Sequence, residues 1–385
     1  MNSIYLDYAS STPLANEVVD EMVSAISNND FGNPSSTDHE YGKHAYDLIE
    51  DCRRDVANLI HADQREIIWT SGATEANNLA ILGSYEFNLK NKSGNIITSM
   101  TEHKSVIEPF KTLEKKGLRV LLLSPKKNGE IDLNKLEKTI NEDTLMVSLM
   151  HINNETGVLS DIESIGEICR KKNVIFHVDA AQSIGKVPID VKNFKVDMMS
   201  LASHKIYGPK GIGALYINGE TLGRIAPILQ GGGQERGIRP GTLPTHQIVG
   251  MAAAFRLAKK HMNNDLNHIM KCRALFLKSI ASIEDAVINT NEVSTFPGIM
   301  SLRLPDLDAE SIIFGMKTIA LSKGSACTSD SDEPSHVLKS MGLNQEEIRG
   351  TLRISFGRYT TMNEVSIAAE ALTKIVTHLK LIKGQ

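Results

Sequence analysis

Residues 200–213 read Ser-Leu-Ala-Ser-His-Lys-Ile-Tyr-Gly-Pro-Lys-Gly-Ile-Gly and hold Lys205 between two apolar segments. The segments from Val196 to Leu201 and from Ala214 to Ile217 are typical of strands, so we expect Lys205 at the mouth between two buried strands. Partial loss of water there lowers the pKa of an ammonium group, and such a lysine forms a Schiff base with an aldehyde. Taken alone, the stretch is explained at least as well by a surface lysine at a hairpin turn, so the rest of the chain has to decide.

The composition fits a large core, with two domains expected from 385 residues. Hydrophobic residues make up 41% and the net charge is −4, which leaves no basic surface for nucleic acid or anionic membrane. The N-terminus lacks the basic and apolar segments of a signal peptide, and no run is apolar enough to span a bilayer. Four cysteines far apart, without a CxxC pair, indicate a reducing compartment, here the cytoplasm, and no structural metal site.

Strand and helix patterns alternate from about residue 60 to residue 217. This alternation predicts an α/β fold in which a mostly parallel sheet is covered by helices on both faces. The predicted strands before Val196 are 66–70, 95–99, 119–123, 145–151 and 174–179, and the predicted helices are 105–116, 133–140, 162–172 and one that opens at Thr74. Residues 28–42 are rich in Asn, Ser, Gly and Pro and are expected to form a loop.

The last third of the chain predicts a smaller α+β domain. Its expected strands are 298–304 and 351–356, and its expected helices are 265–282 and 363–380. Another helix, 248–262, precedes it. We therefore expect a large domain over residues 15–262 and a small domain made of residues 1–14 and 263–385.

Polar residues cluster where the predicted parallel strands end, the edge at which such sheets bind ligands. They are Ser71–Thr74, His103, Asn153 and Asn154, Asp179 and Lys205. The first group opens a helix, where backbone N–H groups and hydroxyls form a cup for phosphate, although a plain N-cap at Thr74 explains it as well. It is neither a Walker loop nor a dinucleotide fingerprint.

Asp179 ends an apolar strand, where a carboxylate needs a cationic partner. That partner is either an arginine or the protonated ring nitrogen of a cofactor. A phosphate cup, a buried aspartate and a Schiff-base lysine on one sheet together indicate pyridoxal phosphate.

Three more residues are candidates for chemistry, each with a structural alternative. His103 follows a strand and could stack on a flat ring and move protons, or be a satisfied core histidine. Cys327 lies in a small-residue loop, which suggests a nucleophile rather than a chance surface cysteine. Arg353 lies in an apolar strand and needs a carboxylate, which is either a substrate or an internal partner.

A family resemblance extends these inferences nearly end to end. The chain resembles cysteine desulfurases of the NifS/IscS type, which are fold-type I pyridoxal phosphate enzymes of the class V aminotransferase family. The motifs that carry it are Tyr5-Leu-Asp-Tyr-Ala9, Phe31-Gly-Asn-Pro-Ser35, Thr70-Ser-Gly-Ala-Thr-Glu75, Thr101-Glu-His-Lys104, His151-Ile-Asn-Asn-Glu-Thr-Gly157, His177-Val-Asp-Ala-Ala-Gln182, His204-Lys-Ile-Tyr-Gly-Pro-Lys-Gly211, Gln234-Glu-Arg-Gly-Ile-Arg-Pro-Gly-Thr242 and Gly324-Ser-Ala-Cys327. The resemblance implies a large domain with a mostly parallel seven-stranded sheet and a smaller C-terminal α+β domain.

The resemblance also implies a role for each site residue. Lys205 forms the Schiff base and shuttles the substrate Cα proton, His103 stacks on the ring as acid/base, and Cys327 attacks the substrate sulfur to give a persulfide and alanine. Asp179 pairs with the ring nitrogen and Gln182 contacts the ring hydroxyl. The phosphate is held by Ala73, Thr74 and His204, with Thr242 reaching in from a neighbouring subunit of a homodimer. Asn154 and Arg353 hold the carboxylate of L-cysteine.

The chain departs from the family pattern in two places. The family usually reads Ser-x-His-Lys, whereas Ala202-Ser203 precedes His204 here. The phosphate therefore either loses a hydroxyl contact or receives one from Ser203 in another way. The chain also ends at Gln385, earlier than housekeeping members whose tail helps to dock an iron–sulfur scaffold, so the acceptor stays open among such scaffolds, tRNA or thiamine sulfur carriers and DNA-phosphorothioation proteins.

Two rival functions remain at the level of sequence. One is another lyase or aminotransferase of the same fold, such as a selenocysteine lyase, for which Cys327 would be dispensable for selenium release. The other is a catalytically silent sulfur-relay scaffold, which would be colourless and indifferent to Lys205→Ala. The presence of both Lys205 and Cys327 argues against the silent scaffold.

Overall fold

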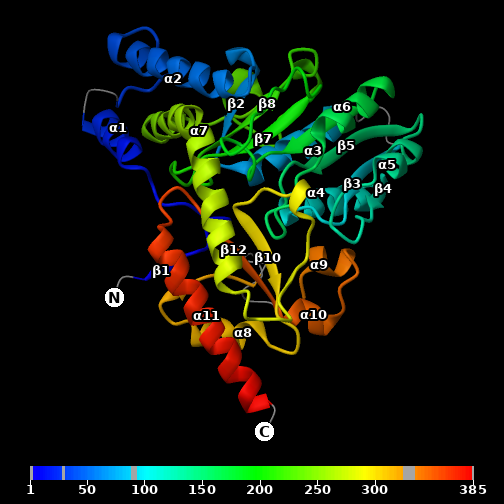
Figure 1. The fold of residues 1–385 in the computed structure, drawn as a ribbon. Coiled ribbons are helices and arrows are strands. Elements are labelled where there is room, and N and C mark those ends of the chain that lie inside the picture. Colours follow the sequence, from blue (N-terminus) through cyan, green and yellow to red (C-terminus); the bar gives the residue numbers. More distant parts are fainter. Residues whose placement is uncertain (1–2, 28–30, 88–92, 324–333, 384–385) are drawn as a thin grey trace.

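A seven-stranded sheet forms the centre of the large domain, in a computed structural model that describes residues 3–27, 31–87, 93–323 and 334–383 (Figure 1). In spatial order its strands are β2 (Ile67–Thr70), β8 (Gly213–Ile217), β7 (Met198–Ala202), β6 (Ile175–Asp179), β5 (Thr144–Met150), β3 (Asn95–Ser99) and β4 (Arg119–Leu123). The neighbours from β7 to β4 pair in parallel, and β8 is antiparallel to both β2 and β7. The predicted α/β class and mostly parallel sheet are confirmed.

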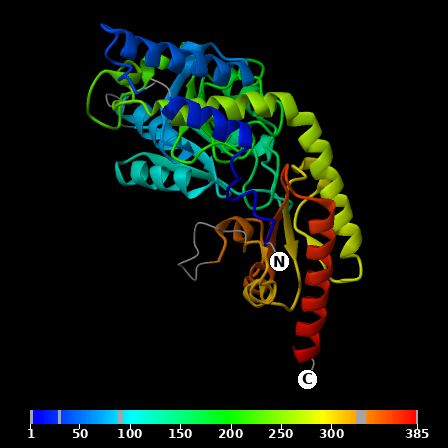
Figure 2. The ribbon, with the colours of Figure 1, turned by 90° about the vertical axis from the view of Figure 1, so that its left-hand side faces the viewer.

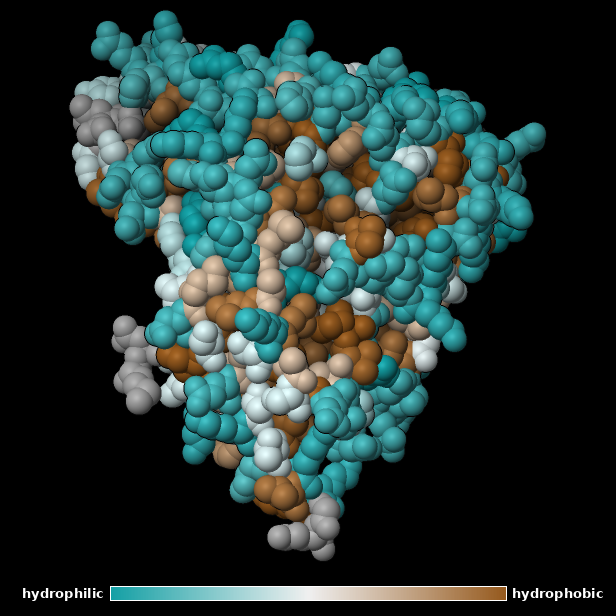
Figure 3. All heavy atoms as spheres, in the orientation of Figure 1, coloured by the Kyte–Doolittle hydropathy of each residue, from teal (hydrophilic) through white to brown (hydrophobic). Residues whose placement is uncertain are grey.

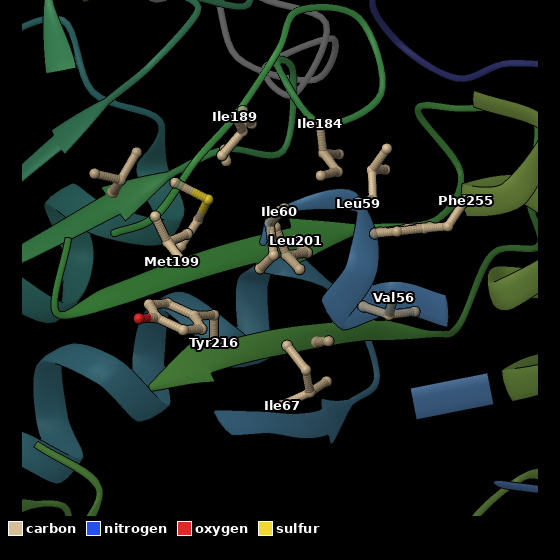
Figure 4. Packing of buried hydrophobic residues seen from close by; sticks show 14 of the residues in the cluster. Val56, Leu59, Ile60, Ile67, Ile184, Ile189, Met199, Leu201, Tyr216 and Phe255 are labelled. Carbon is tan, nitrogen blue, oxygen red and sulfur yellow. The ribbon is translucent and has the colours of Figure 1, made fainter. Parts of the chain in front are cut away.

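Alternation along the inner strands explains why helices cover both faces of this sheet, since neighbouring residues point to opposite sides. On β7, Met199 and Leu201 belong to one core cluster, whereas Met198, which points to the opposite face, belongs to the other. The first cluster packs under α1 (Asn16–Ser27), α2 (Glu40–Leu59), α5 (Leu133–Thr139), α6 (Ile162–Lys171) and α7 (Thr245–Ser279), and the second packs under α3 (Ala73–Phe87) and α4 (Lys104–Lys115). Figure 4 shows Met199, Leu201 and Tyr216 meeting the α2 and α7 side chains.

Helix α7 connects the large and small domains as one continuous helix of 35 residues. The predicted break between residues 262 and 265 is wrong, because Asn263 and Asn264 cost a helix interior only a few tenths of a kcal/mol more than its other residues. Phe255 in the first half belongs to the large-domain core, and Phe276 in the second half belongs to the small-domain core. The expected domain limit at residue 262 lies inside this helix and stays a prediction.

The small domain is built on a three-stranded antiparallel sheet, in the order β12 (Thr351–Ser355), β10 (Ile299–Arg303), β9 (Val287–Ile288). The N-terminal strand β1 (Ile4–Tyr5) pairs in parallel with β11 (Ile319–Ala320). Its helices are α8 (Ala309–Gly315), α9 (His336–Ser340), α10 (Gln345–Arg349) and α11 (Met362–Lys383), and α11 runs beside the second half of α7 (Figure 2).

One feature of the large domain differs from the predictions. Helix α2 begins at Glu40, inside the expected loop of residues 28–42, because the imidazole of His39 accepts the N–H of Gly42 as an N-cap. Within the described ranges of the chain, none of the helices has the length and apolarity needed to cross a membrane. Hydrophilic residues cover most of the large domain on the face in Figure 3, and hydrophobic residues gather where the two domains meet.

A buried ion pair fastens the 3-10 segment Gln234–Gly237 to the sheet. Both guanidinium Nη atoms of Arg53 donate to the carboxylate of Glu235, at 2.7 and 2.8 Å, and the same carboxylate accepts the N–H of Trp69 at 2.7 Å. The Arg53 guanidinium also lies over the Trp69 ring. Glu235 and Arg236 hold left-handed φ angles of 47° and 57°, which are unfavourable for residues with a Cβ, so the pair holds a strained turn in place.

We predict that Glu235→Ala lowers the free energy of unfolding by about 3 kcal/mol, because it leaves the Arg53 charge buried without its bidentate partner. Urea unfolding followed by circular dichroism measures this change. Glu370→Ala is the matched control, since Glu370 pairs with Lys374 on an exposed surface and its loss should leave the urea midpoint unchanged. Equal midpoints for the two variants would contradict the anchoring role of Glu235.

Candidate active site

A cavity of about 540 Å³ opens at the carboxyl ends of the parallel strands. This is the position at which parallel α/β sheets bind ligands. The structure brings nine of the sequence-predicted residues into its wall: Ala73, Thr74, His103, Asn154, Asp179, Gln182, His204, Lys205 and Arg353. They come from both domains, since Arg353 lies on β12 of the small domain.

The N-terminus of α3 forms one end of the cavity. Its first-turn N–H groups at Ala73 and Thr74 have no partner within the helix by geometry, and they carry the positive end of the helix dipole. Gly72 precedes them, and a Cβ at Gly213 of the neighbouring strand would lie 2.6 Å from the Gly72 Cα, so only glycine fits there. Lys210 and His204 also line the cavity. The set is suited to a phosphate group.

His204 stays neutral beside this cup. Burial, reinforced by the charges of Lys205, Lys210 and Lys186, lowers the pKa of His204 to about 4. Its Nδ1 lies 3.3 Å from the Ser11 Oγ. At neutral pH the imidazole is therefore a hydrogen-bonding group rather than a cation.

A chain of hydrogen bonds connects Asp179 to His103. The Asn77 side-chain amide donates both its hydrogens, one to the Asp179 carboxylate and one to the Ser105 hydroxyl, each at 2.8 Å. The Ser105 hydroxyl lies 2.8 Å from His103 Nδ1, which also accepts the N–H of Ser105. Because Nδ1 accepts, the proton of the neutral imidazole sits on Nε2. Asp179 and His103 are thereby held in fixed orientations by residues that sequence reasoning did not single out.

The Lys205 ammonium group lies against the N-terminal segment. Its Nζ donates to the carbonyls of Ala9 and Ser10 at 2.6 and 2.7 Å. The Ala9 carbonyl also accepts the Gln182 Nε2 at 2.6 Å. Neither of these two carbonyls carries a charge that would stabilise the ammonium form, which suits an amine that must react.

Arg353 reaches the cavity from the small domain with spare hydrogen-bonding capacity. Its Nη1 donates to the Asn154 carbonyl at 2.9 Å and its Nη2 to the Asp7 carboxylate at 2.8 Å. The residue is 2% exposed, and its Nε has no hydrogen-bond partner among the described residues. Both alternatives for Arg353 are therefore present: it has an internal carboxylate and it can still take a second anion.

Two of the predicted residues that the structure describes, Ser203 and Thr242, are not in the wall of this cavity. Ser203 is fully buried, and its hydroxyl has no hydrogen-bond partner among the described residues. It faces Gly208, because it follows Ala202 at the end of β7 and the alternation of the strand turns it away from the cavity. The expectation that Ser203 contacts the cofactor is thus not supported by its position. Thr242 is exposed and outside this protomer's cavity, and Cys327 lies outside the described residues.

Sequence reasoning missed two carboxylates and a histidine in the wall. Glu102 is buried with one oxygen accepting the Met150 N–H, and burial raises its pKa well above the usual range. Glu155 accepts the Ser335 hydroxyl at 2.5 Å, and burial raises its pKa too. The His336 Nε2 lies 2.9 Å from the backbone carbonyl oxygen of Glu102. Glu102 and Glu155 belong to two of the family motifs, Thr101–Lys104 and His151–Gly157. An acidic residue within such a motif was the sequence feature that could have identified them as site residues.

The comparisons with known proteins first define a class. The family model Aminotransferase class-V matches residues 4–367, so the chain belongs to that family.

Within this class, the similar proteins are a sequence relative and two solved structures. A relative from Neisseria meningitidis serogroup C named "Cysteine desulfurase IscS" is 47% identical over 377 residues, which are 98% of this chain and 93% of the relative. A solved structure of a NifS-like protein matches with a TM-score of 0.91 at 32% identity, over 98% of this chain and all of the other. SspA in complex with cysteine matches with a TM-score of 0.79 at 34% identity, over 93% and 100% of the two chains. The predicted resemblance is confirmed.

Beneath the cavity, His177 is predicted to make stability depend on pH. It is buried on the same face of β6 as Asp179, between the hydroxyls of Ser148 and Ser200, and burial lowers its pKa to about 3. The unfolded chain binds a proton there near pH 6.5 and the folded chain does not, so stability falls as the pH drops below about 6.5. The slope for this group is about 1.4 kcal/mol per pH unit.

His177→Gln removes this contribution. We expect its stability deficit relative to the wild type to shrink as the pH is lowered from 7 to 5, measured by urea unfolding at each pH. His378→Gln, at an exposed position of α11, is the control and should run parallel to the wild type. A constant deficit for His177→Gln across this range would contradict the assignment.

Proposed function

We propose that the chain is a pyridoxal phosphate-dependent cysteine desulfurase, which converts L-cysteine to L-alanine and leaves the sulfur as a persulfide on Cys327. The observation that carries the proposal is one cavity holding Lys205, the buried Asp179 and the α3 N-terminus. The high similarity to relatives named cysteine desulfurase IscS supports it.

The residues present fit pyridoxal phosphate. A phosphate matches the first-turn N–H groups of Ala73 and Thr74 together with His204. Asp179 is buried, and its two carboxylate oxygens accept the Ala181 N–H and the Asn77 amide, which leaves each oxygen a further lone pair for a ring nitrogen. Gln182 matches the ring hydroxyl, and Lys205 matches the aldehyde. When bound, the cofactor supplies an electron sink that acidifies the substrate Cα–H.

The protein's own groups then have separate tasks. Arg353 and Asn154 orient the substrate carboxylate, since both line the cavity that holds Lys205. The Lys205 amine takes the Cα proton, since it lies on the same wall as Asp179. His103 carries its proton on Nε2, because Ser105 occupies Nδ1, and so serves as the proton donor within the cavity.

Sulfur transfer needs a thiolate, for which the proposal takes Cys327 from the sequence. The Cys327 sulfur attacks the sulfur of L-cysteine, an S–S bond forms, the substrate Cβ–S bond breaks, and its electron pair stays with the carbon skeleton. Protons at Cβ and Cα complete alanine. The other three cysteines are buried, and burial raises the pKa of Cys52 and Cys169 to about 12 and that of Cys272 to about 11, so none of them is a competing thiolate at neutral pH.

The proposal includes a homodimer that passes the persulfide to a sulfur-acceptor protein. Thr242 is exposed and lies outside its own cavity, which suits a residue supplied to a second copy. An apolar stripe on α1, formed by Val19, Val23 and Ile26, is also exposed, at 38%, 54% and 64%. The spacing of this stripe places it on one helix face, suited to a second copy of the chain.

Lys205→Ala is predicted to lower the rate of alanine formation by about three orders of magnitude, because the only amine assigned to the Cα proton is lost. The assay measures alanine produced from L-cysteine with saturating cofactor. Lys192→Ala is the control. Lys192 is an exposed lysine that precedes β7 in the chain, and its loss should leave the wild-type rate unchanged. Wild-type turnover by Lys205→Ala would contradict the proposed function.

Cys327→Ser is predicted to abolish persulfide formation and alanine production while the protein still binds pyridoxal phosphate. A serine hydroxyl is far less nucleophilic toward sulfur than a thiolate. Mass spectrometry of the intact protein after exposure to L-cysteine measures the added sulfur, and Cys169→Ser is the control. Sustained turnover of cysteine by Cys327→Ser would favour the alternative in which the cysteine is dispensable, as for selenium release.

A further inference from the structure

Lys186 contacts Gln182, a residue of the active-site cavity, but does not itself line that cavity. The proposed function gives Lys186 no role. It follows β6 in a series of tight turns, in which Ser183 and Ile184 donate backbone N–H groups to the Ala180 carbonyl and Lys186 donates to that of Ser183. Lys186 follows Gln182 by four residues, and these turns bring the two side chains to the same side of the chain. Gly185, at a φ of 68°, lets the segment pack closely against Ala258 of α7.

The hydrogen bonds of the Gln182 side chain with Lys186 and Ala9 allow only one orientation of its amide. The Lys186 Nζ donates to the Gln182 Oε1 at 2.8 Å, and the Gln182 Nε2 donates to the Ala9 carbonyl at 2.6 Å. Lysine is a donor only, and a backbone carbonyl is an acceptor only. A reversed amide would set NH₂ against Nζ and oxygen against the Ala9 carbonyl, so both contacts would become repulsive.

We propose that Lys186 is a positioning residue, which fixes the Gln182 amide with its NH₂ end toward Ala9 and the active-site cavity. This inference rests on the proposed function, in which Gln182 meets the ring hydroxyl of pyridoxal phosphate. An ionised ring oxygen requires a donor, and Lys186 ensures that the donor end of the amide faces it. The same carbonyl of Ala9 accepts a hydrogen bond from Lys205, so Gln182 and Lys205 share one backbone acceptor, and Lys186 is joined to it through Gln182.

The surroundings of Lys186 support a role at the site over a purely structural one. Its Nζ lies 5.8 Å from the centre of the Phe296 ring, in the wall of a second cavity of about 30 Å³ that also includes Ala9. The ion pair of Asp265 and Arg358 lines the same small cavity. Among the described residues no carboxylate lies within 4 Å of the Lys186 Nζ, and its side chain donates to the uncharged amide of Gln182 instead.

Burial, with added repulsion from Lys205 and Arg353, lowers the pKa of Lys186 to about 7. Its charge is therefore present below about pH 7 and is lost as the pH rises above it. Above that pH the neutral amine still donates an N–H to the Gln182 oxygen, but it also carries a lone pair that can accept. Lys186 therefore selects the amide orientation most strongly below about pH 7, and above it the Ala9 carbonyl still favours the same orientation.

Lys186→Met tests the inference in the protein loaded with pyridoxal phosphate. The readouts are the pH midpoint of the visible absorbance band of the bound cofactor and the rate at which the cofactor is lost on dilution. Without a fixed donor the ring oxygen holds a shared proton more tightly, so we expect the midpoint to rise by about one unit and retention to fall about tenfold. Lys186→Arg, which keeps a charged donor, should restore most of the wild-type midpoint.

A double-mutant cycle with Gln182→Leu separates positioning from a direct or structural effect. If Lys186 acts through Gln182, then Lys186→Met causes little further shift in the Gln182→Leu background. An equal shift in both backgrounds, or an unchanged midpoint in Lys186→Met, would overturn the inference. Lys192→Met is the control for loss of a nearby surface lysine and should match the wild type.

Two precautions keep the test decisive. Circular dichroism checks each fold, and if Lys186→Met does not fold, Lys186→Gln replaces it, since its polar end falls about one bond length short of Gln182 and should give the same shift. A wild-type protein that binds no pyridoxal phosphate would defeat the proposed function itself. Wild-type binding with an unshifted Lys186 variant would defeat only the inference about Lys186.

Discussion

The backbone from Leu6 to Ala15 is the constraint on which the cavity depends, because it joins both domains at the reactive lysine. On the small-domain side, Leu6 donates to the Ala320 carbonyl and accepts the N–H of Ser355. On the large-domain side, Thr12 and Ala15 donate to the carbonyls of His204 and Tyr207, which flank Lys205. Between these anchors the carbonyl of Ala9 faces inward, where Lys205 and Gln182 both donate to it. A shift of this short segment would therefore disturb both domains and both side chains at once.

The strands could be predicted where a short β-rich run is bounded by turn residues, at the half-exposed edge of the sheet as well as in its centre. The predicted ranges 95–99 and 119–123 coincide with β3 and β4, because apolar strand residues there are bounded by turn residues. The site could be predicted for a related reason: the residues that follow such strands, Asp179 and Lys205 among them, must meet at one edge of a parallel sheet. Chemistry-bearing residue types at strand ends thus carried information about position as well as about function.

What could not be predicted depends on contacts between residues distant in sequence. The Arg53–Glu235 pair joins α2 to a strained turn 182 residues later, and no local pattern marks either residue as buried. The course of α7 through Asn263 and Asn264 is decided by cores of two domains that hold its two halves. Ser203 could not be predicted for a different reason. The sequence motif puts a hydroxyl one residue before His204, but the alternation of side chains along the strand turns this hydroxyl toward Gly208 and away from the cavity.

Two hydrogen-bonded sets approach the cavity from different sides, and both act by fixing the direction of an amide. Asn77 is held between Asp179 and Ser105, and Gln182 is held between Ala9 and Lys186. The Asn77 NH₂ faces Asp179 and Ser105, and the Gln182 NH₂ faces the Ala9 carbonyl. An amide is well suited to this task because its donor and acceptor ends differ while its shape does not, so a single wrong neighbour would reverse the hydrogen-bond pattern without changing the packing. The proposed chemistry therefore requires the residues that orient Asp179 and Gln182 as well as Lys205 itself.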